Sequence, residues 1–145
     1  MLFRSVKTYQ HHVRIHWGHT DPAKIVFFPN YYVWMDQSTL LLFESVGLGW
    51  EALEAKYDVP GLPLVETGSN YKFPCKFGDE IVVETTIAKW NDKTVEIAHR
   101  ILNKTHGNKL AVEGREVRVW AGPHPDDPKR LKAKSIPEEV KQAFA

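Results

Sequence analysis

One stretch decides the fold: PNYYVWMDQSTLLLFESV, residues 29–46, followed by Gly47. Pro29 suits the first turn of a helix, where a missing backbone N–H leaves no acceptor unpaired, and Gly47 suits the position just past a helix end. Apolar residues point in nearly every direction around this helix, which is typical of a helix buried within a protein rather than laid on its surface. The stretch therefore predicts one long central helix.

On both sides of this helix the apolar pattern changes to period two, which indicates strands. Residues 9–17 alternate, with Val13, Ile15 and Trp17 on one face. After residue 63 the alternation returns around residues 69–73, and turn-forming residues then separate three segments rich in Val, Ile and Thr, at 80–90, 94–103 and 109–121. Shorter helices are expected at 50–56 and after Ser135, with the tail from Pro123 otherwise polar. The order predicts an α+β domain, with one antiparallel five-stranded sheet, its last four strands in hairpin-like succession, packed against the central helix.

Composition excludes several classes of protein. The 145 residues make one domain, 1–145, with 19 Lys and Arg against 18 Asp and Glu and a net charge of +1. This balance argues against a nucleic-acid scaffold, and the one cysteine excludes an intrachain disulfide. No apolar run is long enough to span a membrane, and residues 1–7 lack the apolar core of a secretory signal, so the expected compartment is the cytoplasm.

A single helix covers only part of a five-stranded sheet, and the open edges of the sheet predict a partner chain.

The loop from Gly18 to Tyr31 is the first candidate for chemistry. It brings the carboxylate of Asp21 close in sequence to the start of the long helix, where first-turn amides have no intrahelical acceptor and the helix dipole is positive. Such amides stabilise an oxyanion, and a carboxylate beside them can attack an acyl carbon or activate water. The alternative is that Asp21-Pro22 only starts a turn and Pro29 only opens the helix.

The same loop carries a family resemblance. DPAKIVFFPNY (residues 21–31), followed by WMD (34–36), resembles the hot-dog-fold acyl-coenzyme A thioesterases and is most similar to the 4-hydroxybenzoyl-coenzyme A thioesterase family. The resemblance continues through SNY (69–71), GDEI (78–81) and RVW (118–120). It implies a sheet wrapped around one long helix, a dimer or tetramer with its active sites at the subunit interface, an acyl-coenzyme A substrate, and no cofactor or metal.

The resemblance also implies roles for individual residues. Asp21 is the catalytic carboxylate, acting as nucleophile or general base, and the backbone amide of Phe28 polarises the thioester carbonyl. Asp36 matches the position that contacts the ring hydroxyl of a hydroxybenzoyl group, and Trp34 helps to shape the acyl pocket. Asp36 is also the only acid between residues 30 and 43 of an otherwise apolar helix, although it could instead lie on a wet stripe of that helix with Gln37 and Thr39, or bond to a neighbouring subunit.

Two residues depart from the family pattern. Lys24 stands where the family usually has Gly, so if that position needs a positive φ, the loop must differ here. His19 stands where a second acid is common, and a protonated His19 would favour the charged form of Asp21. For the coenzyme A phosphates, Lys93 and Arg118 are the expected basic partners, with Lys129–Lys134 as a further basic segment.

Other side chains have simpler interpretations. His12 and His16 share one strand face and could in principle ligate a metal, but an exposed face accounts for them better. Cys75 is expected to be a packed residue, His99 a sheet residue, and Glu66 structural or pocket-lining. Two alternatives to an aromatic acyl-coenzyme A thioesterase stay open: a thioesterase for fatty or short-chain acyl groups on coenzyme A or acyl carrier protein, and a domain that binds an acyl group without cleaving it.

Overall fold

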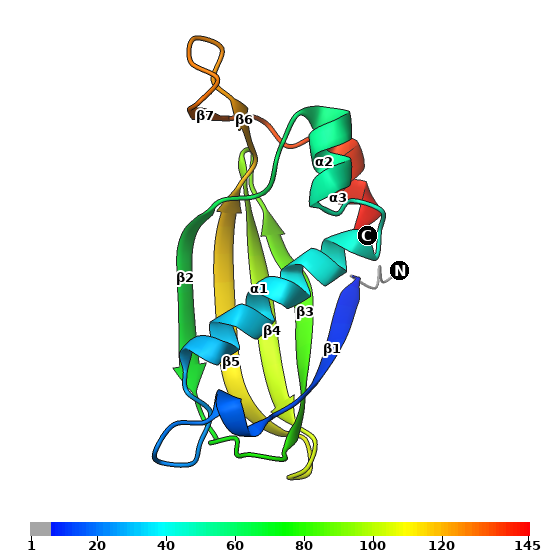
Figure 1. The fold of residues 1–145 in the computed structure, drawn as a ribbon. Helices are drawn as coiled ribbons and strands as arrows, with labels where there is room; N and C mark the ends of the chain where they lie inside the picture. Colours follow the sequence, from blue (N-terminus) through cyan, green and yellow to red (C-terminus); the bar gives the residue numbers. More distant parts are fainter. Residues whose placement is uncertain (1–6) are drawn as a thin grey trace, which may run out of the picture.

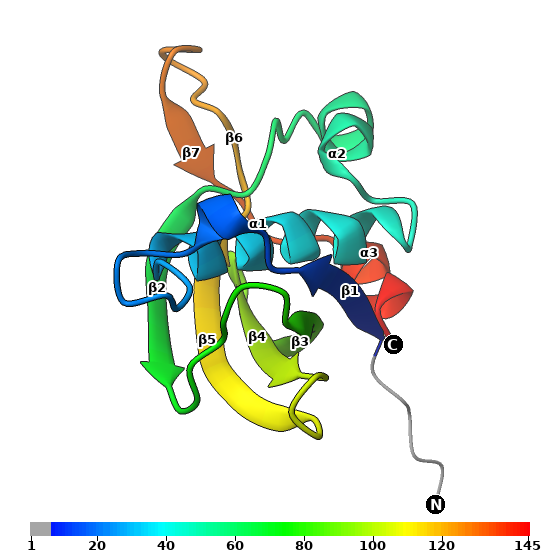
Figure 2. The same ribbon diagram turned by 60° about the horizontal axis from the view of Figure 1, so that its bottom comes forward.

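A computed structural model describes residues 7–145, and the residues Met1–Val6, which contain most of the segment inspected for a signal, lie outside this range. A five-stranded sheet curves around one long helix, as the sequence predicts (Figures 1 and 2). The sheet strands are β1 (Thr8–Arg14), β2 (Leu64–Tyr71), β3 (Glu80–Trp90), β4 (Thr94–Asn103) and β5 (Lys109–Val119). The helices are α1 (Pro29–Glu44), α2 (Trp50–Tyr57) and α3 (Glu138–Ala143).

The strand order is β1-β3-β4-β5-β2, with every neighbouring pair antiparallel. Short turns join β3, β4 and β5 as expected, but the prediction of four consecutive hairpin-like strands is wrong for β2. That strand pairs with β5, with Tyr71 opposite Val112, and residues 72–79 then cross the end of the sheet to reach β3. The segment is too long for a tight hairpin loop, which explains why β2 and β3 are not neighbours. The two sheet edges are therefore β1 and β2 (Figure 1).

Helix α1 buries one face on the sheet and leaves the opposite face open. Tyr31, Trp34, Met35, Ser38, Thr39, Leu42 and Phe43 are buried. Val33, Asp36 and Gln37 point outward and are exposed. The prediction of a helix buried on all sides is therefore wrong for a single chain, because α1 has the sheet on one side only (Figure 2).

The interior contains two apolar clusters. One includes Leu42, Phe43 and Ile97, and the other includes Met35 and Ile101. Between them, along both α1 and the strands, lies a row of buried polar side chains that we call the polar belt: Ser38, Thr39, Thr85, His99 and Glu116. Buried polar groups are stable only when they are hydrogen-bonded, so the belt requires mutual partners across the helix and the sheet.

Element ends differ from the predicted ones in three places. The first strand stops at Arg14, and Trp17 lies in the 3-10 turn η1 (Trp17–His19), where it is 72% exposed. The polar tail contains a small hairpin of β6 (Ala121–Pro123) and β7 (Leu131–Ala133), which projects beyond the sheet (Figure 1). Helix α3 follows Pro137 as its N-cap, with no side-chain cap from the Ser135 segment.

Candidate active site

The loop between η1 and α1 contains a tight turn closed on Asp21. The Asp21 amide donates to the Ile25 carbonyl at 2.9 Å, and the Lys24 amide donates to the Asp21 carbonyl at 2.8 Å. The Ala23 amide donates to Asp21 Oδ1 at 2.8 Å, which fixes one carboxylate oxygen and leaves the other outside this turn. The expected turn-forming role of Asp21-Pro22 is therefore present, and it also orients the carboxylate.

Lys24 adopts a φ of 66° in this turn. The loop thus keeps the left-handed conformation that glycine would favour, rather than rearranging because a glycine is missing. A side chain in this region costs about 1 kcal/mol or more, and the three hydrogen bonds of the turn oppose that cost.

Backbone contacts then lead the chain into α1. The Val26 amide donates to the Cys75 carbonyl at 2.9 Å, and the Phe27 amide donates to the His19 carbonyl at 2.8 Å. Asn30 Nδ2 donates to the same His19 carbonyl at 2.9 Å, so the first turn of α1 is tied to the loop. The next amide, that of Phe28, donates to no acceptor within residues 7–145. A free N–H therefore lies at the positive end of a 16-residue helix.

A pocket of about 450 Å³ brings this helix start together with the Asp21 turn. Asp21 and Phe28 line it with Tyr31, and the remaining lining comes from the loop and from the segment after β2, namely Ile25, Val26, Tyr71, Lys72, Phe73, Pro74 and Cys75. Burial raises the pKa of the Tyr31 hydroxyl, so the phenol stays protonated. Four of the ten lining residues are aromatic, and the charged residues Asp21 and Lys72 line the same pocket as the helix-start residue Phe28.

His19 belongs to the same loop, and its ring accepts a hydrogen bond. Its Nδ1 accepts the His16 amide at 2.9 Å, a role that only an unprotonated ring nitrogen can fill. Partial burial and the neighbouring His16 lower the pKa of His19. A lowered pKa disfavours the protonated His19 that was considered as a partner of Asp21, and the imidazole packs edge-on against Trp34, with ring centroids 5.1 Å apart.

Trp34 and Asp36 lie on different faces of α1. Trp34 is buried in the apolar cluster, against Tyr31 and His19, and does not line the pocket directly. The Asp36 side chain is 64% exposed on the outward face and does not line the pocket of its own chain. The alternative of a wet helix stripe is right for Asp36 and Gln37 but wrong for Thr39, which is fully buried.

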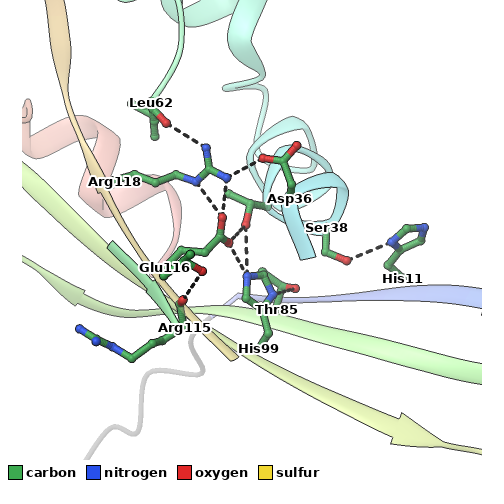
Figure 3. Close-up of polar contacts among 11 residues, drawn as sticks. His11, Asp36, Ser38, Leu62, Thr85, His99, Arg115, Glu116 and Arg118 are labelled. Carbon is green, nitrogen blue, oxygen red and sulfur yellow. Dashed lines mark hydrogen bonds and ion pairs between the residues drawn. The ribbon is translucent and has the colours of Figure 1, made fainter. Parts of the chain in front are cut away.

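Arg118 joins Asp36 to the polar belt (Figure 3). Its guanidinium contacts Asp36 Oδ1 at 2.6 Å, the Leu62 carbonyl at 2.9 Å and Glu116 Oε1 at 3.0 Å from Nε. Glu116 also accepts hydrogen bonds from His99 Nε2 and the Thr39 hydroxyl. Burial alone raises the pKa of Glu116, but these hydrogen bonds and the charges of His99 and Arg118 outweigh it, and the pKa lies below its usual range.

This network was missed from the sequence, although a signal for it exists. His99 lies on the same buried face of β4 as Ile97 and Ile101. Glu116 is buried in β5 between Arg115 and Val117, which are less buried. Once β4 and β5 are paired, Ile97 lies opposite Glu116, so the belt follows from hairpin register combined with burial. Arg118 was expected at the surface for phosphate binding; instead its side chain is only 7% exposed, and its donors are engaged inside the chain.

The other basic candidates lie far from the Asp21 turn within one chain. Lys93 is exposed in the turn between β3 and β4, and its carbonyl accepts the Trp120 amide at 2.8 Å. That turn and the β6–β7 hairpin with Lys129–Lys134 are at one end of the sheet, and the loop before α1 is at the other (Figure 1). A single chain therefore does not bring Lys93 to the pocket.

The remaining candidates have structural surroundings. Cys75 is fully buried, and Glu66 is exposed and paired with Arg115. His12 and His16 are exposed, and residues 7–145 contain no cluster of three or more His, Cys, Asp or Glu side chains suited to a metal ion. None of the helices within the same range is long and apolar enough to cross a membrane.

Comparison with known proteins identifies the family. The model of the "Thioesterase-like superfamily" matches residues 15–144. The 4-hydroxybenzoyl-CoA thioesterase of Pseudomonas sp. (strain CBS-3) is 31% identical over 129 residues, covering 87% of this chain and 89% of that protein. The putative acyl-CoA thioesterase YneP of Bacillus subtilis (strain 168) is 29% identical over 63% of this chain and 64% of its own length.

Solved structures agree with this match. A crystal structure of a 4-hydroxybenzoyl-CoA thioesterase mutant in complex with 4-hydroxybenzoyl-CoA superposes with a TM-score of 0.86 at 27% identity, covering 95% of this chain and 99% of that one. A gentisyl-coenzyme A thioesterase gives a TM-score of 0.77 at 32% identity, covering 94% and 100%. The chain therefore belongs to the thioesterase-like superfamily, has the hot-dog fold, and is a thioester hydrolase.

Proposed function

We propose that this thioester hydrolase cleaves acyl-coenzyme A thioesters whose acyl group is a hydroxylated aromatic ring. One observation supports the proposal: Asp21 and Phe28, whose backbone amide has no acceptor within residues 7–145, line one pocket together with the aromatic side chains of Tyr31, Tyr71 and Phe73. The likeness to enzymes named for 4-hydroxybenzoyl-coenzyme A and gentisyl-coenzyme A supports the aromatic acyl group.

The chemistry follows from these two groups. The thioester carbonyl oxygen accepts a hydrogen bond from the Phe28 amide, where the dipole of α1 favours the negative charge that develops during attack. The free oxygen of Asp21 either attacks the carbonyl carbon, giving an anhydride that water then cleaves, or removes a proton from the attacking water. In both routes the tetrahedral intermediate collapses with loss of the coenzyme A thiolate. The Phe28 side chain, 55% exposed, takes no part, since the amide alone is required.

Recognition of the ring requires a second subunit in this proposal. Asp36 faces away from the pocket of its own chain, so we assign the contact with the ring hydroxyl to Asp36 of a neighbouring subunit. Trp34 supports the pocket from behind, through Tyr31. Lys93 would likewise bind coenzyme A phosphate only across an interface. We accordingly propose a dimer or tetramer, acting in the cytoplasm, with its active sites at the subunit interface.

A panel of thioesters tests the proposal. Released thiol is measured with 4-hydroxybenzoyl, benzoyl, short-chain and fatty acyl-coenzyme A, and with an acyl carrier protein thioester. We expect the highest kcat/KM with the hydroxylated aromatic substrate. Best turnover of an aliphatic substrate would replace the aromatic assignment with the fatty or short-chain one.

The variant Asp21→Asn tests the mechanism, and the chain offers a close control. Asp127 also precedes a proline, and its Oδ1 accepts the amide two residues on, from Lys129, at 3.1 Å. Asp127→Asn therefore changes the same kind of turn in the β6–β7 hairpin. We expect kcat to fall at least about a hundredfold for Asp21→Asn and to stay near wild type for Asp127→Asn. Wild-type turnover by Asp21→Asn would refute the assigned carboxylate.

A further inference from the structure

Arg118 connects the protein interior to an exposed carboxylate on the outer face of α1. The Arg118 side chain is 7% exposed, whereas that of Asp36 is 64% exposed, and the two are joined at 2.6 Å through Asp36 Oδ1 (Figure 3). An exposed aspartate on a helix ordinarily samples several rotamers. Here the buried Arg118 guanidinium holds Asp36 Oδ1, and Asp36 Oδ2 takes no part in this ion pair.

The guanidinium is itself fixed from behind. Glu116 accepts hydrogen bonds from Nε and from the same terminal nitrogen that contacts Asp36. The Leu62 carbonyl, in the segment before β2, accepts a hydrogen bond from the other terminal nitrogen at 2.9 Å. Because Glu116 and the Leu62 carbonyl hold the planar fork, the direction of the Arg118–Asp36 contact is determined by β5 and the segment before β2 rather than by α1.

Other members of the polar belt hold Glu116 in turn. His99 Nε2 and the Thr39 hydroxyl donate to its second oxygen, and the Thr85 hydroxyl lies 2.7 Å from His99 Nδ1. The carboxylate partner assigns the ring a proton on Nε2. The chain of contacts from β3 to Asp36 thus crosses β4 and β5, so each side chain in it has its orientation set by the one before it.

We propose that Arg118 is a positioning residue that presents the Asp36 side chain as a fixed acceptor to the hydroxyl group of the acyl ring, and so determines the preference for hydroxylated aromatic thioesters. This inference rests on the proposed function, because it takes Asp36 as the group that meets the ring. It assigns Arg118 to the acyl end of the substrate rather than to the coenzyme A phosphates. A preorganised acceptor loses little conformational freedom on binding, which is the source of the selectivity.

The test compares two substrates that differ in one hydroxyl group. The ratio of kcat/KM for 4-hydroxybenzoyl-coenzyme A to that for benzoyl-coenzyme A is measured for wild type, Arg118→Met, Asp36→Asn and the double variant. We expect Arg118→Met and Asp36→Asn each to lower this ratio about tenfold, as for loss of a hydrogen bond to a charged group. The double variant should lower it no further than Asp36→Asn alone, because Arg118 acts through Asp36.

Two further variants keep the test decisive. Arg118→Lys retains a positive charge beside Glu116 but lacks the planar fork, so it should also lower the ratio of the two kcat/KM values. This variant replaces Arg118→Met if Arg118→Met does not fold. Arg115→Met removes another arginine of β5, which pairs with Glu66 at the surface, and should keep the wild-type ratio.

The outcomes separate this inference from the proposed function. An unchanged ratio in folded Arg118→Met and Arg118→Lys, with the ratio lost in Asp36→Asn, would overturn the positioning role and leave the proposed function intact. An equal loss on both substrates would also overturn it, because it would show a general structural role. Failure of wild type to hydrolyse either aromatic thioester would instead refute the proposed function.

Discussion

Gly114 in β5 faces α1 at a point where there is no space for a side chain. A Cβ added at Gly114 would lie 2.3 Å from Met35 Sδ and 3.1 Å from Met35 Cε, whereas ordinary contacts begin at 3.4 Å. The thioether would have to move by about 1 Å, and Met35 is only 1% exposed within an apolar cluster. We therefore predict that Gly114→Ala destabilises the fold through overpacking between α1 and β5.

The magnitude follows from two opposing effects. Overpacking of a filled core costs about 1–3 kcal/mol, although methionine is the most adaptable side chain to displace. Replacing glycine by alanine within a strand recovers about 0.5–1 kcal/mol, because the unfolded chain loses conformational freedom. The two midpoints give an expected net loss in the free energy of unfolding of about 1 kcal/mol, measured by urea denaturation at fixed protein concentration so that oligomerisation does not alter the comparison.

Gly68→Ala is the matched control, because a Cβ at Gly68 in the neighbouring strand β2 would meet nothing within 4 Å. That variant should be neutral or slightly more stable than wild type. Met35→Ala removes the opposing side chain, so its cost in the Gly114→Ala background should be at least about 1 kcal/mol smaller than in wild type. Equal stability of Gly114→Ala and Gly68→Ala would refute the reasoning.

Three further predictions concern protonation. The pKa of Glu116 is lower in the folded state than its usual 4.5, so its contribution to stability is present above about pH 4.5 and is lost as the pH falls through the folded pKa. Glu116→Gln should therefore reduce the loss of unfolding free energy that wild type shows at acid pH. Burial lowers the pKa of His11, whose Nδ1 lies 3.0 Å from Ser38 Oγ, so stability should decline as the pH falls below 6.5, and His11→Gln should reduce that slope between pH 7 and 5. Burial also raises the pKa of the Cys75 thiol, so alkylation by iodoacetamide at pH 8, followed by mass spectrometry, should be at least about a hundredfold slower in native than in urea-unfolded protein; equal rates would contradict this.

The sequence predicts the elements better than their arrangement. Strands at 80–90 and 94–103 agree with the structure because period-two patterns and turn residues are local signals. The pairing of β2 with β5 was not predicted, since it depends on a contact between segments about 45 residues apart in sequence that no local pattern records. Trp17 alternates with Ile15 like a strand residue, yet the chain leaves the sheet after Arg14.

Side-chain positions likewise could be predicted where they depend on neighbours in sequence and not where they depend on distant segments. Asp21 and Phe28 are close in sequence, so the loop motif was sufficient to expect them at one pocket. Arg118 was expected to bind the coenzyme A phosphates. It lies instead beside Glu116, two residues away on β5, and its side chain meets Asp36 of α1, a contact between segments 82 residues apart that no local pattern records. The left-handed φ of Lys24 likewise depends on the turn around it rather than on the residue type.

The polar belt also constrains how far α1 can slide along the sheet. A slip of one helical turn is about 5.4 Å and would carry Thr39 into apolar surroundings while moving Leu42 or Met35 over Glu116. Either displacement would leave a buried carboxylate without its hydrogen bond from Thr39, at a cost of about 1–3 kcal/mol. The polar belt thus fixes the position of Asp36 along the sheet, in addition to the apolar packing on either side.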